Sequence, residues 1–313
     1  MTYKRLLNNC TYLIVALGLM MFISSCGGSN EEVVQEEEGI STEEDGTNEF
    51  ESESMSVNKA GKVFYMIPSP LELSSIIKDA GASYDKSVLN STEYVSNYVT
   101  SGSQALNLGV YGADLSYSSI FEQTQETVQY FNSAKTLADE LGITSAFGKS
   151  TVERIQNNLN NRDSMIAIIS DSYWEADAYL KENSRSNTSA LVIAGGWIEA
   201  LYISTKLAEK SDNSDEILSR IGEQKLTLNN LVPMLEKFQG PDVNEVIASL
   251  QELQNAFNAV EITYTRKDPT TDAESQLTTL QTTSKISISD EALASISEKV
   301  ASIRNNIVMP TGN

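Results

Sequence analysis

Apolar residues recur every three or four positions through most of the 313-residue chain, and this spacing constrains the fold more than any other feature. Such spacing places the apolar side chains on one face of a helix. Glycine and proline, which interrupt helices, number only 17 and 6. The clearest stripes are Val128, Phe131, Ala134, Leu137, Ala138 and Leu141, and, near the end of the chain, Leu293, Ile296, Val300, Ile303 and Ile307. The chain is therefore predicted to be mainly helical.

Start and stop signals between these stripes predict at least eight helices joined by short connections. Ser69 followed by Pro70 and Glu72 has the residue order of a helix N-terminus, whereas Gly81 and Gly142 are stop signals. We predict a single all-α domain over residues 61–313. Its helices form either a multi-helix bundle or the pairs of a short solenoid. Alternating polar and apolar residues allow at most one small β-hairpin, near 262–288.

The first 25 residues have the features of a secretory signal peptide. Lys4 and Arg5 precede an apolar run from Leu13 to Ile23, which is too short to span a membrane because a spanning helix needs about 20 residues. The run ends in Ile23-Ser24-Ser25-Cys26, which resembles the lipobox of bacterial lipoproteins. The resemblance implies cleavage before Cys26 and lipidation of this residue. We therefore expect residues 1–25 to be removed and Cys26 to anchor the protein to a membrane.

The segment after the cysteine is acidic. Residues 27–56 contain eleven acidic residues, no basic residue and the single aromatic Phe50. Such a composition buries too little apolar surface to fold, so residues 26–60 are predicted to be the lipidated cysteine and a disordered tether. Glu31 and Glu32, soon after Cys26, resemble the surface-export signal of Bacteroidota lipoproteins. This resemblance implies an outer-membrane location and favours an outward-facing protein over a periplasm-facing one.

The charge and the residue types exclude several classes of function. The whole chain has a net charge of −21. This balance argues against nucleic-acid binding, which depends on Lys and Arg neutralising phosphates. The chain has no histidine, which removes His-based catalytic triads, zinc sites and haem ligation. We expect no metal and no cofactor, and any catalysis would depend on carboxylates, Ser-Lys pairs or tyrosine.

Two glycine-containing helical stretches carry the candidate binding residues. Gly109 and Gly112 lie in a helix predicted over about 92–117 with a break at Gly102, and glycine in a helix is costly unless another element packs closely. The second stretch, Ala194 to Glu199, places Glu199 on an apolar stripe, where an acid needs a partner. One hypothesis is that five residues converge on a polar pocket inside the bundle: Tyr111, Asp114, Asp171, Trp174 and Glu199. The alternative is that the glycines only allow helix contact and the acids bond to neighbours.

The segment from Tyr111 to Ile203, with NLGVYGADLSY, NNLNNRDSM and VIAGGWIEALY, is similar to a family of uncharacterised, all-helical Bacteroidota lipoproteins. The resemblance implies an exported helical domain and supplies no activity or site residue. The first functional hypothesis is a non-enzymatic, lipid-anchored envelope protein that binds a protein or a small molecule. The second is an envelope enzyme that acts on a glycan through two carboxylates.

Overall fold

The computed structural model describes residues 67, 69–143, 146–210, 214–266, 270–272, 277–279 and 282–309, all within the unit Asn48–Asn313. The predicted signal peptide, Cys26 and the acidic tether lie outside the described residues. The helices are α2 (Pro70–Asp79), α3 (Ser101–Ile120), α4 (Thr124–Glu140), α5 (Lys149–Asn158), α6 (Arg162–Glu182), α7 (Ser186–Ala208), α8 (Ser214–Leu235), α9 (Pro241–Phe257) and α10 (Asp290–Val308). Two 3₁₀ turns, η1 (Lys86–Val88) and η2 (Thr92–Asn97), connect α2 to α3.

The helix ends follow the local sequence signals. The Ser69 hydroxyl accepts a hydrogen bond from the backbone N–H of Glu72 at 3.2 Å, and Pro70 occupies the first helical position of α2. Gly81 and Gly142 adopt positive φ angles of 90° and 73° after α2 and α4, where a side chain would be strained. The helical stretch predicted over 92–117 is divided close to the predicted break at Gly102: residues 92–97 form the 3₁₀ turn η2, and the α-helix follows it. This helix begins at Ser101, because Thr100 and Ser103 form a reciprocal cap there.

Helices α3 and α7 form the centre of the bundle. Of their residues, 17 of 20 in α3 and 18 of 23 in α7 are buried, as expected for helices that are packed on all sides. Their backbones are in direct contact at glycine. A Cβ on Gly109 would lie 2.0 Å from the Val192 carbonyl oxygen, and one on Gly195 would lie 2.0 Å from that of Leu106. The close packing predicted from these glycines is confirmed.

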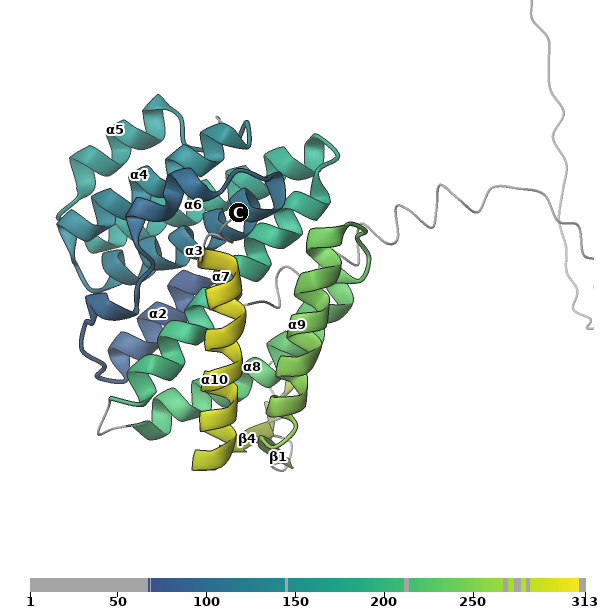
Figure 1. The fold of residues 1–313 in the computed structure, drawn as a ribbon. Helices are drawn as coiled ribbons and strands as arrows, with labels where there is room; N and C mark the ends of the chain where they lie inside the picture. The colour runs from purple at the N-terminus through teal and green to yellow at the C-terminus, as the bar shows by residue number, and fades with distance from the viewer. Residues whose placement is uncertain are drawn as a thin grey trace, which may run out of the picture. The chain divides into compact units, whose positions relative to one another are not determined.

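The other helices surround this central pair. Helix α2 covers one side of both, and α4 and α6 cover the other side of α3 (Figure 1). Helix α8 packs on α7, while α9 and α10 run side by side with α10 against α7. The arrangement is an all-α bundle around a central pair of helices, which confirms the predicted fold class.

The predicted β-hairpin is present at the end of α9. Strand β1 (Glu261–Arg266) pairs antiparallel with β4 (Thr282–Ser287), in a register that places Ile262 opposite Ile286. Nested between them in the chain, β2 (Thr270–Asp272) pairs with β3 (Leu277–Thr279). Ile286 packs over Gly222 of α8, where a Cβ would lie 2.3 Å from the Ile286 side chain. This contact joins the hairpin to the bundle.

Among the described residues, α7 alone is long and apolar enough to cross a membrane. Its most apolar stretch is 78% buried within the structure. The packing against α3 and α8 accounts for this apolarity.

Candidate functional site

The five residues predicted to converge on one pocket divide into two groups. Tyr111, Asp114 and Glu199 lie together in the bundle interior, each with an exposed fraction of 0%. Asp171 and Trp174 lie on the outer face of α6, where each side chain is 53% exposed. The single converging pocket is therefore not formed.

The buried acid of α7 is held by an arginine from the last helix. Arg304 donates from Nε to Glu199 Oε2 at 2.9 Å and from Nη2 to Oε1 at 3.0 Å, a bidentate pairing. The guanidinium also lies 4.7 Å from the ring centre of Tyr202. Burial raises the pKa of Glu199, and the charge of Arg304 opposes that shift. The expectation that Glu199 needs a partner is confirmed, although the sequence did not identify Arg304.

Asp114 of α3 is the second acid of this buried cluster. Its Oδ2 accepts the backbone N–H of Asn90 at 3.2 Å. Burial, followed by the charge of Glu199, raises the pKa of Asp114 well above its ordinary value, and Asp114 Oδ1 has no hydrogen-bond partner among the described residues. Because Arg304 pairs with Glu199, the raised pKa favours a neutral Asp114 beside the Glu199–Arg304 ion pair.

Three buried tyrosines form hydrogen bonds with the loop residues Asn90 and Ser91. The Asn90 side-chain amide donates to Tyr98 Oη at 3.2 Å, and its carbonyl accepts from Tyr130 Oη at 2.9 Å. Tyr111 Oη donates to the Ser91 carbonyl at 2.8 Å. Burial raises the pKa of each tyrosine, so all three remain neutral donors. These bonds hold the segment between η1 and η2 against α3 and α4.

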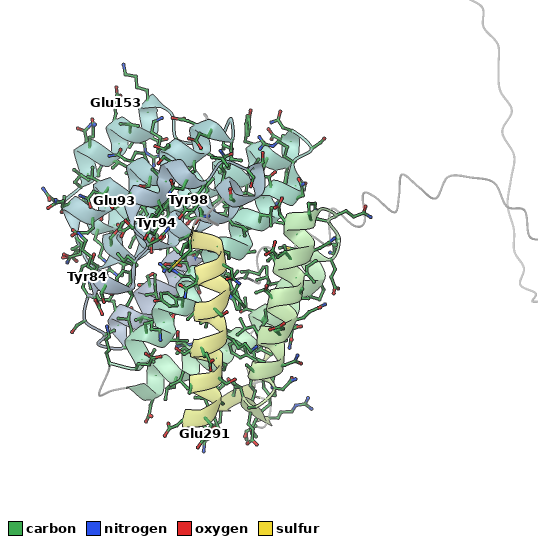
Figure 2. The ribbon with its side chains drawn as sticks, in the orientation of Figure 1. Tyr84, Glu93, Tyr94, Tyr98, Glu153 and Glu291 are labelled. Atoms are coloured by element: carbon green, nitrogen blue, oxygen red, sulfur yellow. The ribbon has the colours of Figure 1, made fainter. Side chains whose placement is uncertain are left out.

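The same network fixes the end of α10. Tyr98 Oη donates to the Val308 carbonyl at 2.9 Å, and Asn107 Nδ2 donates to the Ile307 carbonyl at 3.0 Å. Figure 2 shows Tyr98 beside the end of this helix, opposite the end that carries Glu291. These two contacts join residues 210 and 200 positions apart in the chain, and the Arg304–Glu199 pair joins residues 105 positions apart. The buried cluster therefore has a structural role: it holds the end of α10 against the rest of the bundle. None of the cavities described below has Tyr111, Asp114 or Glu199 in its wall.

The outer face of α6 contains the other two predicted residues. Asp171 Oδ2 accepts from Arg154 Nη2 of α5 at 2.7 Å, with both side chains well exposed. Trp174, one turn further along α6, lies in the wall of a groove of about 320 Å³. The groove is therefore the candidate site for a ligand, because it is open, largely apolar and of the size that holds small molecules.

The groove lies between the start of α2 and helices α6 and α7. Ile67, Pro70 and Leu71 form the α2 side, and Val192, Ile193 and Gly196 form the α7 side. The wall is completed by three aromatic and four polar residues: Tyr173, Trp174, Trp197, Ser69, Ser170, Glu72 and Asp177. Trp197 is almost fully buried and its Nε1 donates to Gln224 Oε1 at 3.0 Å, so its indole is fixed in place. Trp174 provides the exposed aromatic surface.

The charged groups of the groove are acids. Glu72 is exposed at the start of α2. Asp177 accepts from Ser189 Oγ at 2.5 Å and from Lys181 Nζ at 2.6 Å, so its charge is partly neutralised. Among the described residues, no lysine or arginine lines the groove. This wall favours neutral or cationic ligands over anionic ones.

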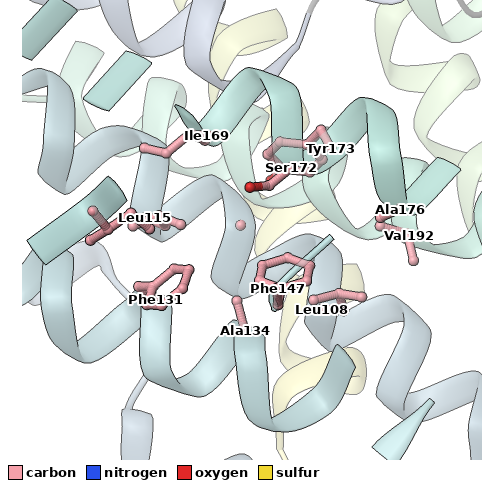
Figure 3. A pocket seen from close by; sticks show the side chains of 12 residues that line it. Leu108, Leu115, Phe131, Ala134, Phe147, Ile169, Ser172, Tyr173, Ala176 and Val192 are labelled. Carbon is pink, nitrogen blue, oxygen red and sulfur yellow. The ribbon is translucent and has the colours of Figure 1, made fainter. Parts of the chain in front are cut away.

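A second space lies behind the groove wall and is too small for a ligand. It has a volume of about 20 Å³, enough for about one water molecule. Figure 3 shows the surrounding side chains, including Leu115, Phe131 and Phe147. Tyr173 and Val192 belong to the walls of both this void and the groove. The void is a packing defect of the core beside the groove.

The described residues contain no group of three acidic, cysteine or histidine side chains that could hold a metal ion. Sequence reasoning identified Trp174 but missed the rest of the groove, because its walls combine the start of α2 with α6 and α7, which follow it by roughly 100 residues or more. Trp197 could have been found, since it lies inside the glycine-containing stretch of α7.

Comparisons with known proteins supply no relative for this chain. No protein-family model matches it, and searches of the curated proteins and of the solved structures find no significant match. The resemblance to Bacteroidota lipoproteins therefore stays a prediction.

Proposed function

We propose that this protein is a non-enzymatic binding module of the cell envelope, anchored to the outer membrane through lipid on Cys26. Its ligand site is the Trp174 groove. The observation that carries the binding role is a groove of about 320 Å³ whose wall contains both tryptophans of the chain. The ligand is a small, largely apolar molecule that is neutral or cationic.

The groove supports this ligand class in two ways. Its apolar wall can pack against a flat aromatic or an aliphatic ligand. The exposed ring of Trp174 also attracts cations. Glu72 and Asp177 add negative charge, which disfavours an anion. The enzyme alternative has no comparable support, because Asp114 and Glu199 are fully buried and Glu199 is paired with Arg304.

Titration with fluorescent probes tests the groove. N-phenyl-1-naphthylamine is neutral and apolar, and its binding should change tryptophan emission, because both tryptophans lie in the groove wall. Trp174→Ala should weaken this binding by about tenfold or more, the effect of losing about 1.4 kcal/mol. Tyr264→Ala is the matched control, since Tyr264 is 58% exposed on β1, outside the groove wall. Anilinonaphthalene sulfonate, which is anionic, should bind more weakly.

Equal binding of the neutral probe to both variants would reject the groove as the ligand site. Tighter binding of the anionic probe would reject the ligand class.

Metabolic labelling with an alkyne fatty acid tests the anchor separately. Wild-type protein should carry the label and fractionate with the outer membrane. Cys26→Ala should lose both the label and this location, whereas Cys10→Ala, which changes the other cysteine of the chain, should keep both. Label on the Cys26→Ala variant would contradict the anchor and leave the groove untouched.

A further inference from the structure

A polar pocket of about 310 Å³ lies apart from the groove, where α3 ends, α4 begins and α6 begins. Its wall contains Ser119, Glu122, Thr124, Thr127, Asn160 and Arg162. None of these residues belongs to the groove wall. The pocket is therefore a separate candidate site with a different, polar character.

Ser119 is the most unusual residue of this wall. It is 4% exposed, and its Oγ has no hydrogen-bond partner among the described residues. Two nearby serines of the same helix are satisfied: Ser116 Oγ donates to the Gly112 carbonyl and Ser118 Oγ donates to the Asp114 carbonyl, both at 2.8 Å. A buried hydroxyl without a partner is unfavourable. A ligand in the pocket would supply the missing acceptor.

Arg162 provides a second unused donor. Its Nε is buried and has no hydrogen-bond partner in the described part of the chain, while its Nη2 makes only a long 3.4 Å contact to Ser75 Oγ. The described residues give Arg162 no carboxylate partner within ion-pair distance. Arginine N–H groups are well suited to the oxygens of phosphate and carboxylate groups.

The start of α4 adds positive potential to the same wall. Thr124 is the first residue of this 17-residue helix, and the preceding Gln123 makes no side-chain cap. The acid of the first turn, Glu126, is paired with Lys86 at 2.9 Å. The first backbone N–H groups of a helix favour an anion when no cap satisfies them. Here the helix start adds to two unpartnered side-chain donors, both of which lie in the pocket wall.

Glu122 is the acid of the wall and has its own counterion. Its Oε1 lies 3.3 Å from Lys78 Nζ, and its side chain is 65% exposed, so solvent and Lys78 reduce its charge. The remaining wall residues named above are neutral or, in Arg162, cationic. The groups of the pocket wall that have no hydrogen-bond partner are therefore mainly donors, and a ligand with acceptor oxygens would complement them.

We propose that this pocket binds a small oxyanion group, such as a phosphate, a sulfate or a carboxylate. The Ser119 hydroxyl and Arg162 Nε–H donate to its oxygens, beside the start of α4. The site is independent of the Trp174 groove, which disfavours anions.

Thermal unfolding of the full chain tests the proposal. Phosphate, sulfate and acetate are each compared with chloride at constant ionic strength. We expect one or more of them to raise the Tm, by about 3–6 °C at a tenfold excess over its Kd. The anion that gives the largest rise identifies the chemical class. Broadening of the ³¹P signal of inorganic phosphate by wild-type protein gives a readout that needs no variant.

Variants separate this site from a general salt effect. Ser119→Ala removes an unpartnered hydroxyl, so its Tm without anion should equal or exceed that of the wild type, while its affinity for the stabilising anion should fall at least tenfold. Arg162→Gln should lower the affinity for the same anion by a similar factor. Arg154→Gln, which removes an exposed arginine of α5, should respond like the wild type. The proposal is overturned if none of the three anions stabilises the protein, or if Ser119→Ala responds as the wild type does.

Discussion

Glu199 of α7 and Asp171 of α6 both pair with arginine, but in opposite environments. The Glu199–Arg304 pair is bidentate, and the Glu199 side chain is fully buried. The Asp171–Arg154 pair is a single contact at 2.7 Å between side chains that are about half exposed. The sequence led us to place both acids in one hypothetical pocket. The comparison shows that the burial of a helix face decides whether a charged residue on that face stabilises the fold or only contacts solvent.

The physical difference is the cost of removing charge from water. A buried ion pair has already lost its hydration, so each partner depends on the other. An exposed pair keeps most of its hydration and contributes about 0–1 kcal/mol. The buried pair also joins α10 to α7, together with the contacts of Tyr98 and Asn107 to the end of α10. Its loss should therefore loosen the last helix.

The largest effect is expected from Glu199→Ala. This change leaves the Arg304 guanidinium buried without its carboxylate partner and should lower the free energy of unfolding by about 3–5 kcal/mol. Denaturant unfolding followed by circular dichroism measures it. Hydrogen exchange should show α10 opening before α4.

The double variant Glu199→Met with Arg304→Met is the matched control. It removes both charges and fills the space with apolar atoms, so most of the lost stability should return. If Glu199→Ala costs less than about 1 kcal/mol, the pair behaves like an exposed one, and the contrast between the two regions fails.

A middle-sized effect is expected from Asp114→Asn, and it depends on pH. Burial and Glu199 raise the folded-state pKa of Asp114 above its ordinary 3.8, while Arg304 lowers it. Because the folded state holds the proton more tightly, its contribution to stability is complete below the unfolded pKa. The contribution falls as pH rises toward the folded pKa, by at most about 1.4 kcal/mol per pH unit. Asparagine removes this pH dependence, so the free energy of unfolding of the variant should rise relative to that of the wild type as pH rises.

Asp85→Asn provides a control of opposite sign. Lys210 and Ser87 hold the pKa of Asp85 at about 2, so this carboxylate stabilises the fold above its ordinary 3.8 and the effect is lost as pH falls toward 2. The penalty of Asp85→Asn should therefore be largest at neutral pH and disappear in acid. Unfolding of both variants between pH 2 and pH 9 measures the two trends. A flat difference between wild type and Asp114→Asn would place the proton elsewhere.

The sequence was sufficient to predict the helices and the close contact at Gly109, because both follow from local spacing. It was also sufficient to predict that Glu199 needs a partner. It could not identify Arg304, which is 105 positions from Glu199 in the chain. Arg304 lies beside the apolar stripe of α10, and that stripe alone is enough to explain why the helix is buried. The direction of Trp174 was equally hidden, because it depends on which face α6 turns toward α3 and α7. Helical spacing predicts a face, and only packing decides what that face meets.

The smallest effect is expected from Asp171→Asn, which keeps the shape of the side chain and removes its charge. The pair with Arg154 should contribute no more than about 0.5 kcal/mol at low salt, because both side chains are largely hydrated. In 1 M salt, where screening acts within about 3 Å, the difference from wild type should vanish. Urea unfolding at both salt concentrations measures it. A loss above about 1 kcal/mol that persists in 1 M salt would mean that the outer face of α6 is covered in solution. A ligand or a partner on the Trp174 groove would then be the first explanation to test, since Trp174 follows Asp171 by one helical turn.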